Sequence, residues 1–190
     1  AKNKIVNDAL QFALKSKPSP IYDQSFARLI HTGNFDDDMS QISNVDWIIE
    51  VVVERLDIKK KVFENLEEHR TPGTLISSNT SGIPIKFMNE GRSEDFKKHF
   101  CGTHFFNPPR YLKLLEIIPG PDTSKDVLNF LNDYGEKFLG KTTVVFFTQF
   151  GSFLPKFCRA AICCAINVVD TSLNGMPFKI SFETFLPKLF

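Results

Sequence analysis

The stretch DWIIEVVVERLDIKKKVFENLEEHRTPGTLISS, residues 46–78, decides the fold. It begins at Asp46–Glu54 with a β-branched run of the kind found in strands that are buried on both faces. Leu56–His69 follows with apolar residues at helical spacing and ends at a Thr-Pro-Gly stop. Thr74–Ser78 is then a second apolar strand. A strand, a helix and another strand in this order are typical of a parallel sheet in an α/β domain.

Further elements extend this pattern on both sides. Upstream, the sequence predicts a helix over residues 5–17, a strand at Phe26–Ile30 and the acidic start of a helix at Asp36–Asp38. Downstream, it predicts a polar surface segment at Asn89–His99, strands at Phe100–Phe106, Leu114–Ile118 and Thr142–Phe147, and a helix at Asp122–Leu139. The expected fold class is α/β, a partial Rossmann-type doubly wound, mostly parallel sheet with flanking helices.

Composition limits the classes of function. The 23 basic and 22 acidic side chains nearly balance, so the totals indicate neither a nucleic-acid partner nor an anionic membrane surface. The four cysteines form no C-x-x-C pair and no zinc spacing, which favours free buried thiols, no metal and a cytoplasmic setting. The apolar region Val144–Val169 is interrupted by Gln149, Pro155, Lys156 and Arg159, and we expect no membrane span.

Three polar residues stand out as candidates for chemistry. Ser81 follows a strand, where open α/β sheets bind ligands. His104 lies in an apolar strand beside two phenylalanines, and Glu116, twelve residues later, is a carboxylate among aliphatic side chains. A carboxylate that orients an imidazole is a standard acid-base arrangement. The alternatives are a hydrogen-bonded core histidine and a serine that caps a turn, and the Lys59–Lys61 run indicates a solvated helix face.

Several separated motifs together resemble one known family. SSNTSGIP (residues 77–84), GTHFFNPPRYLKLLEIIP (102–119) and LGK (139–141) occur in the order and spacing of the 3-hydroxyacyl-CoA dehydrogenases of fatty-acid β-oxidation. Residues 46–69 also look like the segment that precedes these motifs in that family. The resemblance covers residues 1–141 and is far more specific than any single short motif.

The resemblance implies a Rossmann-type domain that binds NAD and an enzyme that oxidises the 3-hydroxyl of a fatty acyl-CoA. By analogy His104 removes the hydroxyl proton, and Glu116 orients the imidazole. Ser81 and Asn107 contact the substrate. The family positions that line the cofactor are matched by Glu54, Lys59 and Asn79. In the full-length family the resemblance also implies a homodimer.

The sequence departs from the family pattern at both ends. The family opens with a glycine-rich G-x-G-x-x-G turn, whereas the first glycine here is Gly33. Without that unit the strand at Asp46 is expected to have an exposed edge. After the matched part, GSFLPKF puts Lys156 and Phe157 where the family has asparagine and arginine.

These departures predict the domain organisation. Residues 1–147 are expected to form a partial NAD-binding domain, and residues 148–190 a divergent Phe- and Cys-rich tail in place of the start of the family's helical domain. The prediction is a truncated dehydrogenase with impaired or no activity alone. The alternatives are a non-catalytic remnant that binds acyl-CoA or a partner, and an unstable product.

Overall fold

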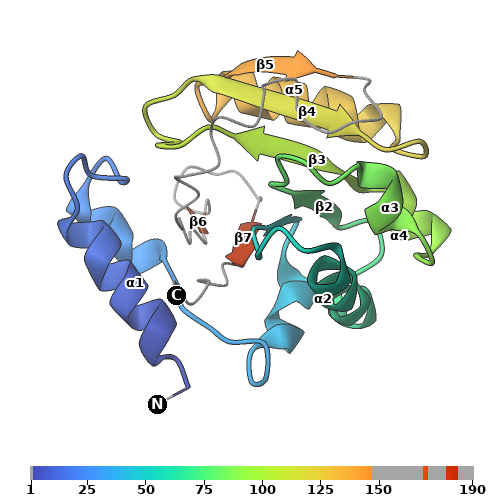
Figure 1. The fold of residues 1–190 in the computed structure, drawn as a ribbon. Coiled ribbons are helices and arrows are strands. Elements are labelled where there is room, and N and C mark those ends of the chain that lie inside the picture. The colour runs from blue at the N-terminus through green and yellow to red at the C-terminus, as the bar shows by residue number, and fades with distance from the viewer. Residues whose placement is uncertain (1, 147–168, 171–178, 184–190) are drawn as a thin grey trace.

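A mixed β-sheet with helices on both faces organises the molecule (Figure 1). The computed structural model describes residues 2–146, 169–170 and 179–183. The helices are α1 (Lys4–Lys15), α2 (Leu56–His69), α3 (Ile85–Asn89), α4 (Glu94–Lys98) and α5 (Lys125–Lys137), with 3-10 turns at Gln24–Leu29 and Met39–Asn44. The strands are β1 (Trp47–Glu50), β2 (Leu75–Ser78), β3 (Phe100–Phe105), β4 (Leu114–Pro119), β5 (Thr142–Val145), β6 (Val169–Asp170) and β7 (Lys179–Glu183).

The described strands run in the order β5-β4-β3-β2-β1-β7-β6. Only the β3–β4 and β6–β7 pairs among them are antiparallel, and the other neighbours are parallel. Because β1, β2 and β3 are parallel and in register, their carboxyl ends meet at one edge of the sheet. The predicted α/β class, with its doubly wound and mostly parallel sheet, is confirmed.

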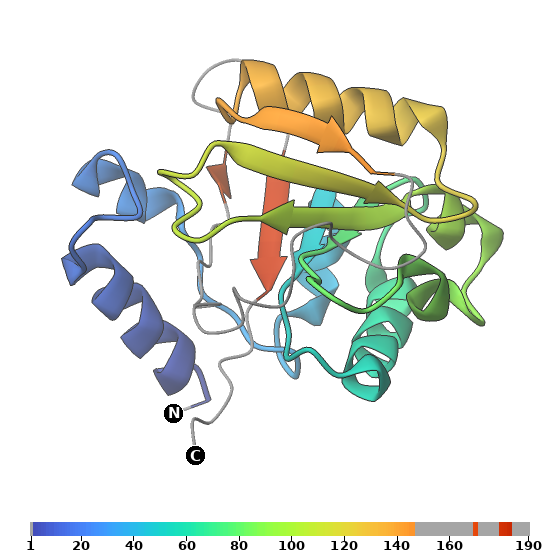
Figure 2. The ribbon, with the colours of Figure 1, turned by 45° about the horizontal axis from the view of Figure 1, so that its top comes forward.

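Alternate residues of the central strands supply two separate cores. Ile48 and Ile76 point to the face covered by α2, α3 and α4, where Phe63, Phe96 and Phe100 pack edge to face or tilted. Trp47, Ile49 and Leu75 point to the opposite face, which α5 covers. Figure 2 shows α5 and the α2–α4 group on different sides of the sheet, with α1 standing apart. This period-two alternation explains why the strand at Trp47 reads as continuously apolar.

The helix of the strand-helix-strand unit begins and ends as the sequence predicts. α2 spans Leu56–His69, and the stop that follows it contains Gly73 at φ 88°. Gly140, at φ 61°, follows α5 in the same way. Residues with a side chain rarely adopt this left-handed backbone, so glycine is required at both positions.

Three upstream and surface predictions were wrong. The predicted strand at Phe26–Ile30 is a 3-10 turn, Gln24–Leu29, because the Asp23 carboxylate accepts the Ser25 N–H at 2.7 Å and caps a helical start. The helix expected from Asp36–Asp38 is only the short turn Met39–Asn44. Asn89–His99 is not simply polar surface, since α4 begins there with the Ser93 cap and buries Phe96 completely.

The edge of β1 also differs from the expectation. The sequence predicts an exposed edge there, whereas β7 pairs with β1 in parallel, with Ile48 opposite Ser181. A strand from the far end of the chain therefore takes the place of the strand that the family pattern supplies at this edge. Most of the predicted tail, residues 148–190, lies outside the described residues, as do Phe147, Gln149, Pro155, Lys156, Phe157 and Arg159.

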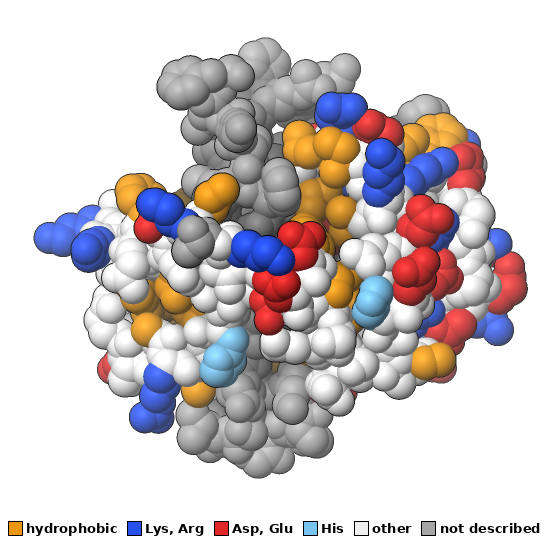
Figure 3. All heavy atoms as spheres, turned by 90° about the horizontal axis from the view of Figure 1, so that it is seen from below, with side chains coloured by type: hydrophobic (Ala, Val, Ile, Leu, Met, Phe, Trp, Pro, Cys, Tyr) orange, Lys and Arg blue, Asp and Glu red, His pale blue; other side chains and the backbone are white. Residues whose placement is uncertain are grey.

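The predictions on cysteines, membrane spans and charge can be compared with the residues that the structure describes. Cys101 is a free, fully buried thiol, and burial raises its pKa. The other three cysteines lie outside the described residues. Across residues 2–146 and the two short strands no helix has the length and apolarity needed to cross a bilayer. Acidic and basic side chains lie interspersed on the face shown in Figure 3.

Candidate active site

His104 and Glu116 face each other across the antiparallel pair β3 and β4, where they are Cα partners. His104 Nδ1 lies 2.7 Å from Glu116 Oε2, and the side chains are 11% and 1% exposed. A carboxylate can only accept, so Nδ1 carries the hydrogen and Nε2 is the ring nitrogen that can accept a proton. Phe106 packs at 4.6 Å between ring centroids against the imidazole. The arrangement is an imidazole whose orientation is fixed by a buried carboxylate.

Asn79 joins the ends of β2 and β3. Its backbone N–H donates to Glu50 O at 2.8 Å, and its side-chain oxygen accepts the Phe105 N–H at 2.8 Å. The second bond is made by the residue directly after His104. Asn79 therefore ties the loop after β2 to the strand that carries the imidazole.

Ser81 lies in the same loop, which is held by a carboxylate from another element. Glu54 Oε1 accepts the Thr80 hydroxyl at 2.6 Å and the N–H groups of Ser81 and Gly82 at 3.2 and 3.0 Å. Burial alone would raise the pKa of Glu54. The hydrogen bonds from Thr80 and Gly82 and the nearby Lys59 ammonium outweigh this effect, and the pKa is lowered. The ionised carboxylate of Glu54 thus fixes the backbone of the loop.

Lys59 does not lie on a solvated helix face, as its place in the lysine run indicated. Its side chain is 1% exposed, and Nζ donates to both Glu50 oxygens at 2.8 and 2.9 Å. Nζ is also 3.4 Å from Glu54 Oε2. A buried charge needs a counter-charge, and Glu50 supplies it. Lys60, by contrast, forms an ion pair with Glu90 at the surface.

Asn107 is exposed in the turn between β3 and β4. The remainder of this turn is held by two cations that the sequence analysis did not select as site residues. Arg110 Nη1 donates to Ser19 O at 2.9 Å and Ile21 O at 2.7 Å. Lys141 Nζ donates to Leu112 O at 2.9 Å and also to Pro109 O, and burial lowers the pKa of this ammonium. The lysine of the LGK motif was the available sequence signal.

Glu54, Asn79 and Ser81 follow the carboxyl ends of β1 and β2, and His104 lies near the carboxyl end of β3. His104 and Glu116 are in contact, and Glu54 is in contact with both Lys59 and the Ser81 backbone. Glu50 was missed, although a lone carboxylate inside the run WIIEVVV was the signal for it. No group of three or more potential metal ligands occurs among the residues that the structure describes.

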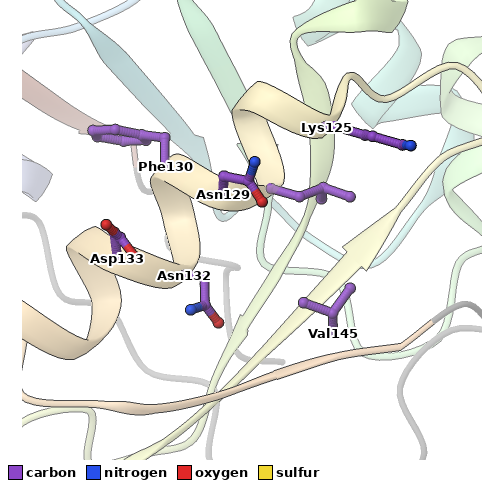
Figure 4. Close-up of a pocket in the computed structure, with 7 residues that line it drawn as sticks. Lys125, Asn129, Phe130, Asn132, Asp133 and Val145 are labelled. Atoms are coloured by element: carbon purple, nitrogen blue, oxygen red, sulfur yellow. The ribbon is translucent and has the colours of Figure 1, made fainter.

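A separate open hollow lies on the outer side of α5 (Figure 4). It has a volume of about 840 Å³, and its lining comes from α5 together with Val145 of β5. None of the predicted site residues lines it. We therefore take the edge near His104, not this hollow, as the candidate active site.

Solved structures identify the class of protein. The chain matches the crystal structure of 3-hydroxybutyryl-CoA dehydrogenase from Escherichia coli with a TM-score of 0.54 and 33% identity, over 57% of this chain and 22% of that one. With its parallel sheet and a histidine-carboxylate pair at the carboxyl edge, the chain is of the Rossmann-type dehydrogenase class.

The family follows from sequence. Residues 1–149 match the family model described as 3-hydroxyacyl-CoA dehydrogenase, NAD binding domain. A Bacillus subtilis protein named as a 3-hydroxyacyl-CoA dehydrogenase is 51% identical over 143 residues, which cover 75% of this chain and 18% of that protein. A Rickettsia felis protein named as a fatty acid oxidation complex trifunctional enzyme is 37% identical over 142 residues, 75% of this chain and 20% of that protein. The chain belongs to the 3-hydroxyacyl-CoA dehydrogenase family, whose enzymes are NAD-dependent oxidoreductases, and it spans well under half the length of these relatives.

Glu54, Lys59 and Asn79, the residues predicted to line the cofactor, all have partners within the chain. Polar groups of Glu54 and Asn79 lie at the carboxyl edge of the strands, where α/β sheets bind nucleotides. A pyrophosphate is usually held by a glycine-rich turn at a helix N-terminus, and the 190 residues contain no G-x-G-x-x-G. The Lys59 ammonium donates to both Glu50 oxygens and to Val52 O, so its hydrogens are already engaged within the chain. Among the described residues, polar groups suited to a nucleotide are thus present at this edge, and a pyrophosphate-binding turn is not.

Proposed function

We propose that this site removes the proton from the 3-hydroxyl of a 3-hydroxyacyl-CoA while the carbon that bears this hydroxyl is oxidised. The observation that carries the proposal is the 2.7 Å contact between His104 Nδ1 and Glu116 Oε2. It leaves Nε2 as an acceptor and places a negative charge where the imidazolium develops its positive charge. NAD, when bound, is the acceptor of the hydride that leaves this carbon.

The other residues position the substrate. Ser81 and Asn107 lie in the two loops next to His104, one after β2 and one after β3. We assign them to the substrate's oxygen and its reacting end. Their loops are fixed by side chains of other segments, by Glu54 in one case and by Lys141 in the other. This fixation favours a pre-organised site, which reduces the entropy lost when the substrate binds.

The remaining features belong to the same proposal. Residues 1–147 act as the NAD-binding unit, with residues 148–190 outside it. Acyl-CoA is the small-molecule partner, the chain has no nucleic-acid partner, and its location is the cytoplasm. A homodimer is the proposed assembly for full-length members. Because the glycine-rich turn is not among these 190 residues, we propose that this chain alone has impaired or no turnover.

NADH production from a 3-hydroxyacyl-CoA by the purified chain tests the proposal. We expect a rate near background. A substantial rate that His104→Ala removes would support the assigned base and contradict the impaired activity. A substantial rate that His104→Ala leaves unchanged would overturn the role of His104.

A second candidate function for these 190 residues is acyl-CoA binding without turnover, since no G-x-G-x-x-G turn occurs among them. Calorimetric titration separates the two candidates. Binding of acyl-CoA with no binding of NAD supports the second candidate, whereas binding of both ligands supports the dehydrogenase site. Circular dichroism of the same sample identifies an unstable product by the loss of fixed aromatic signals.

A further inference from the structure

The innermost charges of the site are Glu50 and Lys59, each 1% exposed. Glu50 ends β1 and Lys59 lies in the first turns of α2. The Glu50 carboxylate is fully engaged: besides Lys59 it accepts the Ser78 hydroxyl at 2.5 Å and the Val52 N–H at 2.5 Å. Such a pair is costly to bury, and well-packed hydrophobic residues of similar volume are often at least as stable. Its retention at the edge of the site needs another reason.

A second carboxylate shares the same ammonium. Glu54 Oε2 is 3.4 Å from Lys59 Nζ, and Glu54 Oε1 holds the Thr80 hydroxyl and the N–H groups of Ser81 and Gly82. The two oxygens of Glu54 thus have different partners. One faces the lysine, and the other fixes the loop.

The charge on Glu50 determines whether Glu54 holds the loop or turns towards Lys59. Lys59 is paired with the nearer Glu50, at 2.8 and 2.9 Å, and Glu54 Oε2, at 3.4 Å, is its second and more distant carboxylate. Without the Glu50 charge, Glu54 would be the remaining counter-charge of a buried ammonium. An unpaired buried charge is more costly than the loss of a few hydrogen bonds at a loop, so Glu54 would turn to Lys59 and release the loop.

We propose that Glu50 is a positioning residue of this site. It neutralises Lys59 and thereby leaves Glu54 Oε1 on the loop that carries Asn79 and Ser81. The loop is in turn bonded to β3 next to His104, through Asn79 and the Phe105 N–H. The importance of the loop rests on the proposed function, whereas the test below measures the loop itself and needs no turnover.

Hydrogen exchange of the Ser81 and Gly82 amides in the full 190-residue chain tests this inference, with Glu50→Gln as the variant. We expect both amides to exchange about tenfold or more faster, since each loses a bond to a charged acceptor. Their proton shifts should also move upfield. The Ile76 amide, which donates to His99 O at 2.9 Å, is the control and should change little. Unchanged exchange of Ser81 and Gly82 in a folded variant would overturn the proposal.

The double variant Glu50→Gln/Lys59→Met separates positioning from mere structural support. It removes the ammonium along with the charge that balances it, so Glu54 should return to the loop. We expect Ser81 and Gly82 protection within about threefold of the original chain, even if Glu50→Gln alone does not fold. A folded double variant with an unprotected loop, or one that fails to fold, would show that the pair only supports the core.

Discussion

His104 and Glu116 should contribute unequally to the free energy of unfolding, and this difference can be measured without any cofactor. The two changes to compare are His104→Phe and Glu116→Leu. Phenylalanine retains a ring against Phe106, whose centroid lies 4.6 Å from the imidazole. It leaves the Glu116 carboxylate, 1% exposed, without its 2.7 Å partner. Leucine at 116 instead removes the buried charge altogether.

The expected magnitudes follow from burial. A buried carboxylate that loses its partner destabilises a fold by about 3–5 kcal/mol, and we expect His104→Phe to fall in this range. Glu116→Leu should change the free energy of unfolding by about 1 kcal/mol or less, because the desolvation penalty of the carboxylate disappears. The Nδ1–H that remains belongs to a side chain that is 11% exposed, so water can reach part of it.

Urea denaturation of the original chain and both variants gives the two values. The double variant His104→Phe/Glu116→Leu completes the cycle and should recover most of the loss caused by His104→Phe alone. A larger loss for Glu116→Leu than for His104→Phe would refute the reasoning. The carboxylate would then stabilise the fold, and its assignment to the imidazole's charge would lose its physical basis.

Three further changes test other parts of the structure. The lowered pKa of Glu54 means that its contribution to stability is present above the unfolded pKa of about 4.3 and is lost as the pH falls through the folded pKa, so Glu54→Gln should flatten the acid side of a urea stability profile. Ser124→Ala should reduce stability by about 1 kcal/mol, because Ser124 Oγ accepts the Val127 N–H at the start of α5; an unchanged urea midpoint would contradict this cap. Phe63→Ala should cost about 3–5 kcal/mol, because the ring is fully buried between Phe96 and Phe100, and a loss below about 1 kcal/mol would show that the core closes around the gap.

The sequence was most informative where the spacing of apolar residues and the order of the elements along the chain indicate the same fold. Residues 46–78 predicted a strand, a helix and a strand, and these are β1, α2 and β2. The first strand ends at Glu50, four residues before the predicted Glu54. The apolar strands could be placed because burial on both faces requires β-branched residues throughout. The contact between His104 and Glu116 was also accessible, because an imidazole and a carboxylate in apolar strands each need a polar partner.

The wrong predictions concern segments in which contacts with other parts of the chain outweigh the local spacing of apolar and polar residues. Nothing local marks Lys59 as buried, because its environment depends on Glu50, nine residues earlier on another element. The 3-10 turn at Gln24–Leu29 depends on one side-chain bond from Asp23, and that bond outweighs the apolar character of the segment. The pairing of β7 with β1 joins residues more than 120 positions apart, which no short window can detect.

His104 and Glu116 are held by a ladder, whereas Ser81 and Asn107 are held by loops. The proton-transfer pair therefore depends on the register of two hydrogen-bonded strands, which can shift only in whole steps. The loops can change length or composition without disturbing that register. Under the proposed function, the two loops that contact the acyl substrate can therefore change while the base and its carboxylate keep their register. Exchange of the two loops between relatives is the way to alter one without the other.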